Sequence, residues 1–213
     1  MKKHNMMRVA SALAVVTLLS TSLISGTLAK YTSEKSADSS TVQVASWAFK
    51  VNDKNIATED FTFDLFGTIK DSAGGPEEDV SKTKVDGKSI IAPGTTGDIE
   101  LTLKNDSEVT ASYTIEFKET QENAKVGSLT RIPLEYAIKE GDTTPAQEDW
   151  KTTIGDIDRK GTQEAPLTIA MNKSKTYKIY WRWNIGGDDT ALGTAMTAPT
   201  VKVNAKVTAT QED

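Results

Sequence analysis

Side chains that commonly carry catalysis are scarce in this sequence. Its single histidine is His4, and it contains no cysteine. Beyond residue 29 the sequence therefore lacks the imidazole and thiolate groups that usually bind zinc, activate a nucleophile or exchange protons near neutral pH. Chemistry based on carboxylates alone, or on a serine paired with a lysine, stays open.

Carboxylates at short spacing are the remaining candidates for a metal or a catalytic pair. Asp156 with Asp158, and Asp188 with Asp189, offer oxygen ligands of the kind that Ca²⁺ binds, but neither follows the longer D-x-[DN]-x-[DN]-G pattern. We interpret them as a solvated turn and a helix cap. The neighbours Glu77–Glu78 lie in a polar loop, which sets no fixed separation for glycoside cleavage. We expect no metal, no cofactor and no catalytic residue.

Two tryptophans form the most prominent aromatic pattern. Trp181 and Trp183 share one face of a predicted strand with Tyr177. Such a row could be an aromatic platform for a sugar, or it could pack in the core of a sheet. Because large aromatic side chains dominate core burial, we expect the core role. Tyr180 and Arg182 would then face outward as surface contacts.

The first 29 residues have the order of a secretory signal peptide. A basic stretch (residues 1–8) precedes an uncharged apolar run (9–24) and a group of small residues (25–29). The apolar run is shorter than the roughly 20 residues that span a bilayer. We expect cleavage between Ala29 and Lys30, secretion, and no stable membrane insertion afterwards. An uncleaved N-terminal anchor is the alternative.

The charge balance argues against nucleic acid and anionic membranes as partners. The chain carries 25 Lys and Arg and 30 Asp and Glu, for a net charge of −5. Residues 1–29 hold three of the basic residues and no acid, so the rest has 22 minus 30, or −8. A nucleic-acid surface needs basic clusters, and electrostatic docking on anionic lipid needs positive charge.

Alternation of apolar and polar residues recurs from Val42 onward and predicts strands with one buried face. The runs are Trp47–Val51, Phe61–Leu65, Ile99–Leu103, Tyr113–Phe117, Leu134–Ile138, Leu167–Met171, Tyr177–Trp183 and Val201–Val207. Turn signals such as Asp86-Gly87 and Pro93-Gly94 separate them. Residues 42–213 are therefore predicted to form an all-β, antiparallel β-sandwich of jelly-roll type, with few short helical turns, one at 188–193. The predicted core includes Trp47, Phe49, Tyr113, Phe117, Trp181 and Trp183.

Two polar segments interrupt this pattern. Lys30–Thr41 lacks apolar periodicity, so we expect it to be extended in the isolated chain. Its length of roughly 40 Å when extended would let it reach a neighbouring molecule and add a strand to an open sheet edge. Tyr31 would be its aromatic anchor, and Val42 and Val44 would continue it. Asp71–Lys84 is expected to be a polar loop.

Three stretches resemble one bacterial family. The segment SGTLAKYTSEKSADSSTVQVASWAFKV (residues 25–51) is similar to the substrates of the SipW-type signal peptidase of Gram-positive bacteria. The segments IAPGTTGDIELTLKNDSEVTASYTIEF (91–117) and TYKIYWRWNIGGDDTALGT (176–194) resemble the TasA/camelysin family.

The resemblance implies a secreted subunit of extracellular biofilm matrix fibres, which donates its N-terminal strand, Lys30–Val44, head to tail to another copy. Its implied partners are other copies, the signal peptidase and accessory matrix proteins. Some members carry a metallopeptidase label, but this chain has no His–Glu–His motif, so we expect no enzyme activity. A secreted endopeptidase of camelysin type and a monomeric cell-surface adhesin or carbohydrate-binding module stay open as alternatives.

Overall fold

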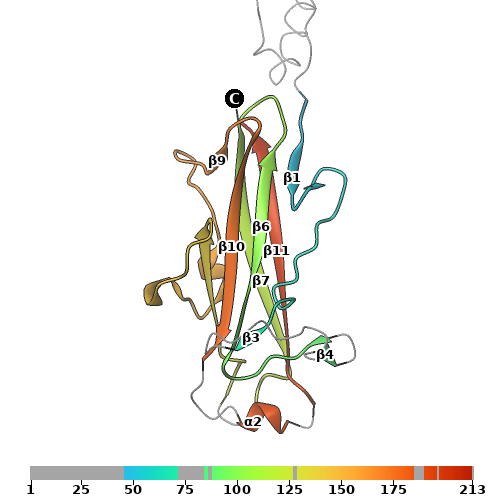
Figure 1. Ribbon diagram of the computed structural model, residues 1–213, viewed down its shortest axis with the longest axis vertical. Coiled ribbons are helices and arrows are strands. Elements are labelled where there is room, and N and C mark those ends of the chain that lie inside the picture. The colour runs from blue at the N-terminus through green and yellow to red at the C-terminus, as the bar shows by residue number, and fades with distance from the viewer. Residues whose placement is uncertain are drawn as a thin grey trace, which may run out of the picture. The chain divides into compact units, whose positions relative to one another are not determined.

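The chain folds into two antiparallel sheets that pack face to face (Figure 1). This computed structural model describes residues 46–71, 84–85, 88–126, 129–184, 190–195 and 197–212. Residues Ala45–Glu212 form one compact unit.

Strands are the main regular secondary structure of the described chain. They are β1 (Phe49–Val51), β2 (Lys54–Asn55), β3 (Lys70–Asp71), β4 (Lys84–Val85), β5 (Lys88–Ser89), β6 (Thr95–Asn105), β7 (Ala111–Glu122), β8 (Leu134–Glu140), β9 (Thr168–Ile169), β10 (Lys173–Trp183) and β11 (Thr200–Gln211). The described helical turns are η1 (Gln147–Asp149), η2 (Ile154–Ile157) and α2 (Thr190–Gly193).

The first sheet has the order β2-β1-β6-β10-β8, with β3 also paired to β6, and the second has the order β11-β7-β9. From β6 to β11, every strand is followed by one in the opposite sheet. Such repeated crossing is a feature of jelly rolls. The predicted all-β antiparallel sandwich is confirmed.

The core lies between the facing sides of β7 and β10. Burial alternates along both strands, because successive side chains of a strand point to opposite faces. The hydroxyls of Tyr113 and Tyr177 meet there at 2.5 Å, so each buried phenol has a hydrogen-bond partner. Of the predicted core residues, Phe49, Tyr113, Phe117, Trp181 and Trp183 are buried, and Trp47 is partly buried against them.

The prediction of a strand at Phe61–Leu65 is wrong. This segment pairs with no strand among the described residues, although its alternating side chains do turn inward. Phe63 packs on Phe117 with ring centroids 5.8 Å apart, and the next aromatic, Phe66, meets the Trp181 ring edge-on at 5.2 Å. Alternation decides which side chains are buried, but a strand also needs a neighbouring backbone in register.

The strand predicted at Leu167–Met171 is shorter than expected. Only β9 pairs within it, because the chain turns at Asn172, whose φ is 57°, and Met171 is left 55% exposed. The predicted turn at Pro93-Gly94 is confirmed. Gly94 has a φ of 88°, and the Thr95 N–H donates to the Ala92 carbonyl at 3.0 Å, as a type II turn requires.

Other predicted local elements are only partly described. The β4–β5 hairpin pairs Val85 with Lys88, around the two residues predicted as its turn. Those two turn residues lie outside the described part, as do Asp188 and Asp189 before α2.

Gly97 supplies a test of close packing on the inner side of the first sheet. It pairs with Trp181 across β6 and β10, and a Cβ added to it would lie 2.1 Å from the Thr68 carbonyl oxygen and 2.5 Å from Trp181 Nε1. We expect Gly97→Ala to lower the free energy of unfolding by about 1–3 kcal/mol, because backbone and indole must both move.

Gly155 in η2 is the matched control for this prediction, since a Cβ there would meet nothing within 4 Å. We expect Gly155→Ala to change stability by no more than about 1 kcal/mol. Urea unfolding of both variants measures the difference, and equal losses would show that Gly97 is not a close-contact position.

Candidate functional site

One lateral flank of the sandwich is closed by the chain between β8 and β10. Tyr136 and Lys151 exchange two backbone hydrogen bonds of 2.8 Å along the outer edge of β8. Ile115 and Arg159 do the same along the edge of β7, at 2.8 and 2.9 Å. Arg159 Nη2 also donates to the Ile138 carbonyl at 2.9 Å, which ties this segment to the first sheet. Both sheets are therefore capped on this flank.

The opposite flank ends in β11, a strand of 12 residues that pairs only with β7 in the described part of the chain. The N–H groups of Tyr113 and Ile115 donate away from β11, to Leu167 and Arg159. Residues of an antiparallel pair alternate between bonded and non-bonded positions. Their partners on β11, Ala209 and Val207, must therefore point their own N–H and C=O groups away from β7.

This alternation gives β11 a free edge, made of the backbone groups of its odd-numbered residues. These residues are Val201, Val203, Ala205, Val207 and Ala209. No hydrogen bond joins their backbone to any residue that the structure describes. Their side chains face the core, yet only Val203 is buried, and the others keep part of their surface exposed. The free edge thus combines unpaired backbone with incompletely covered apolar side chains.

The first sheet is also incomplete on this flank. The Asn52 N–H donates to the Thr102 carbonyl at 2.9 Å, so the even-numbered residues of β6 face β1 and β3. β1 pairs with residues 103–105 and β3 with residues 95–96. Between them, Asp98 and Glu100 pair with β10 on one side of β6, but no described strand pairs with them on the side of β1 and β3. We call this gap in β6 and the free edge of β11 together the open flank.

Charges near the open flank are locally balanced. Lys70 and Lys178 lie 3.0 and 3.6 Å from the Asp98 carboxylate. On the outer face of the second sheet, Lys160 contacts Glu116 at 2.9 Å, and its hydrogen bond is the main reason that the pKa of Glu116 is lowered. Lys206 is a weaker partner of the same carboxylate at 3.8 Å. No large field of one sign therefore surrounds the free edge.

An edge strand of this kind is usually protected. Natural sheets blunt long edges with charged side chains, especially lysine, with proline, with bulges, with inward-pointing charges or with a covering segment. β11 has the sequence TVKVNAKVTATQ, without proline or glycine, and its lysines occupy the outward-facing positions. The two lysines lie on the outer face and not in the row of outward backbone groups, so this row is suited to pairing with another strand.

Several residues singled out in the sequence fall outside the described part of the chain. They are Ala29 and Lys30 at the cleavage site, Tyr31, Val42 and Val44 in the donor segment, and the carboxylates Glu77, Glu78, Asp188 and Asp189. Of the loop predicted at Asp71–Lys84, only its two end residues are described, in β3 and β4.

Of the two described candidates for metal binding, Asp158 has a structural role. Asp158 Oδ1 accepts from the Phe117 N–H at 2.8 Å, and Oδ2 lies 3.0 Å from Lys160. Asp156 is exposed in η2. Within the described ranges, no three His, Cys, Asp or Glu side chains are grouped to hold a metal, and no helix has the length and apolar character to cross a membrane.

The tryptophans do not form an exposed platform. Trp181 is fully buried and Trp183 is 5% exposed. Arg182 faces outward and stacks on Trp150 at 4.1 Å, while the Tyr180 hydroxyl donates to the Thr143 carbonyl at 3.1 Å. The outward residues of this strand are thus bound to their own chain.

Proline substitution can test which backbone groups of β11 are free. The Ala205 N–H belongs to the free edge, whereas the Asn204 N–H points to β7 and Lys118. We expect Asn204→Pro to cost about 1–3 kcal/mol more than Ala205→Pro, because only the first leaves a ladder carbonyl without its donor. Urea unfolding of the two variants checks this. A larger loss for Ala205→Pro would reverse the assignment of the edge.

Comparison with known proteins adds no relative. No protein-family model matches the chain, and a search of curated proteins found no match.

Proposed function

We propose that this protein is a secreted, non-enzymatic structural subunit that assembles into extracellular fibres by strand donation. The N-terminal segment Lys30–Val44 of one copy adds to the free edge of β11 in the next. The observation that carries the proposal is the unpaired edge of β11, with its partly exposed apolar row from Val201 to Ala209.

The lengths of the two partners agree. β11 has 12 residues, so its edge is roughly 40 Å long at about 3.3 Å per residue. Lys30–Val44 spans roughly 50 Å when fully extended. A donated strand would satisfy the outward N–H and C=O groups and cover part of the exposed surface of Ala205 and Val207.

The start of the described chain favours a linear assembly. The Asp106 N–H donates to the Ala48 carbonyl at 2.9 Å, and the Ser46 N–H donates to Glu108 Oε2 at 3.0 Å. Residues 46–48 therefore lie beside the turn between β6 and β7, at the end of the sandwich where β11 finishes opposite Ala111. A donor that leaves from this end and binds along a neighbour's edge makes a head-to-tail contact. Such a contact propagates without closing.

The sequence resemblance supports the same proposal. The order of residues 1–29 supports secretion, and the similarity to the TasA/camelysin family supports a biofilm matrix fibre made in a Gram-positive bacterium. A SipW-type signal peptidase would release the chain by cleaving between Ala29 and Lys30, and accessory matrix proteins are candidate further partners.

Shortening the donor tests the proposal directly. A chain that starts at Lys30 should form fibres in electron micrographs, whereas one that starts at Val42 should not, because most of the donor is gone. Circular dichroism should show the same β-sheet signal for both chains. Equal fibre formation by the two chains would rule out donation by this segment.

Blocking the acceptor tests the other partner. We expect Ala205→Pro, in the chain that starts at Lys30, to remain folded but to reduce fibre formation at least tenfold, because it removes an outward N–H and places a ring at the edge. Ala205→Val keeps the N–H and is the matched control. Light scattering and electron microscopy measure fibre assembly. Fibre growth by Ala205→Pro at the wild-type rate would show that the edge of β11 is not the acceptor.

An enzymatic role predicts a different result. A secreted endopeptidase would cleave casein, and a metallopeptidase would lose that activity when a chelator is added. Chelator-sensitive cleavage that stays with the protein at high purity would defeat the structural proposal.

A further inference from the structure

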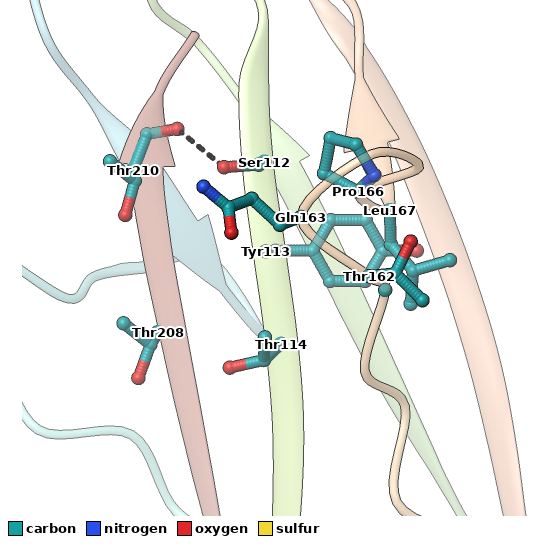
Figure 2. A pocket seen from close by; sticks show the side chains of 10 residues that line it. Ser112, Tyr113, Thr114, Thr162, Gln163, Pro166, Leu167, Thr208 and Thr210 are labelled. Carbon is teal, nitrogen blue, oxygen red and sulfur yellow. Dashed lines mark hydrogen bonds between the residues drawn. The ribbon is translucent and has the colours of Figure 1, made fainter.

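A hollow of about 230 Å³ lies on the outer face of the second sheet, beside the turn between η2 and β9 (Figure 2). Its floor consists of outward side chains from two paired strands. Ser112 and Thr114 of β7 lie opposite Thr210 and Thr208 of β11. The hollow is separate from the free edge, since β11 contributes to it the side chains of even-numbered residues and not the outward backbone groups of odd-numbered ones.

The residues that line the hollow carry no charge. All of them are uncharged, although 26% of the chain is Asp, Glu, Lys or Arg. Charged residues begin at the next outward positions of the same two strands, Glu116 and Lys206. The hollow therefore offers no counter-charge to an ion, and it suits a neutral ligand with several hydrogen-bonding groups.

Most of the polar groups in the hollow have no protein partner. The hydroxyls of Thr114, Thr208 and Thr210 and the Gln163 amide make no hydrogen bond with the described residues. The Ser112 hydroxyl donates to the Thr210 carbonyl at 3.3 Å, and Gln163 lines the same hollow (Figure 2). Hydroxyls and a primary amide both donate and accept, so they can serve a ligand that does the same.

The turn that forms the wall is held in place by its own contacts. A Cβ on Gly161 would lie 2.6 Å from both the Leu167 nitrogen and Pro166 Cα, so the two ends of the turn touch. The Thr162 N–H donates to the Ala165 carbonyl at 3.1 Å, and the Ala165 N–H donates to Thr162 Oγ1 at 3.0 Å. A wall that is ordered before binding lowers the entropy cost of binding.

We propose that this hollow binds one unit of a neutral carbohydrate. The sugar's hydroxyls would pair with Thr114, Thr208 and Gln163, while its C–H face would pack on Pro166 and Leu167. A single sugar in so open a site should bind with a Kd on the order of millimolar. This proposal does not depend on fibre formation.

Saturation-transfer difference NMR tests the site, because it detects protons of the sugar whether the protein is single or assembled. The secreted chain is titrated separately with glucose, galactose and N-acetylglucosamine. The double variant Thr114→Val/Thr208→Val removes two hydroxyls while keeping side-chain shape, and Gln163→Ala removes the amide from the turn. Thr120→Val, on the same outward face of β7 but outside the hollow, is the matched control.

We expect at least one of the three sugars to bind the wild-type chain with a millimolar Kd. The double variant should weaken binding at least fivefold, since each lost neutral hydrogen bond is worth roughly threefold to tenfold. Gln163→Ala should weaken sugar binding at least twofold. Because this residue lies in an exposed turn, the variant serves as a second test if the strand variants misfold. Thr120→Val should bind like wild type. The proposal would be overturned if none of the three sugars bound at a concentration tenfold above the expected Kd, on the order of 10 mM. Equal binding by wild type and Gln163→Ala would also overturn it.

Discussion

The structure depends on how the backbone N–H and C=O groups at each sheet edge find hydrogen-bond partners. A strand at an edge has a row of N–H and C=O groups without partners, and a protein must cover them, expose them to water or pair them with another chain. Here the two flanks of one sandwich differ. Paired backbone at Lys151 and Arg159 closes one flank, while β11 and the middle of β6 leave the other open. The two flanks therefore differ in whether a further strand could pair with them.

Side chains stabilise the open flank where backbone does not. Phe63 and Phe66 come from a segment that forms no ladder, yet they pack on Phe117 and Trp181 from the two sheets. Apolar burial is non-directional, so it can hold such a segment without register. Strand addition requires backbone hydrogen bonds in register. Because Phe63 and Phe66 fill this flank with side chains and not with a paired strand, the outward backbone groups of β11 stay available.

The pleat of β11 directs its free backbone groups and its hollow-lining side chains to different surfaces. Odd-numbered residues of β11 carry the free backbone edge, whereas even-numbered residues such as Thr208 and Thr210 point outward into the hollow. Successive residues of a strand alternate in both backbone and side-chain direction. A strand can therefore bind a partner chain along its edge and a small ligand on its face. In a fibre, repeated hollows would bind a polysaccharide more tightly than one copy does.

The fold class and most of the core could be predicted from the sequence, because alternation shows which residues of a strand share a face. Alternation put Trp181 and Trp183 on one face of a strand and Arg182 on the other, and the tendency of large aromatic side chains to be buried predicted that the tryptophans face inward. The turn at Gly94 could also be predicted from the sequence, since a positive φ favours glycine. Only the tertiary structure decided that Phe61–Leu65 is not a strand, that β11 lies at an edge, and that Thr114 meets Thr208 beside Gln163. These features depend on which distant segments become neighbours, and a local pattern of apolar and polar residues carries no information about that pairing.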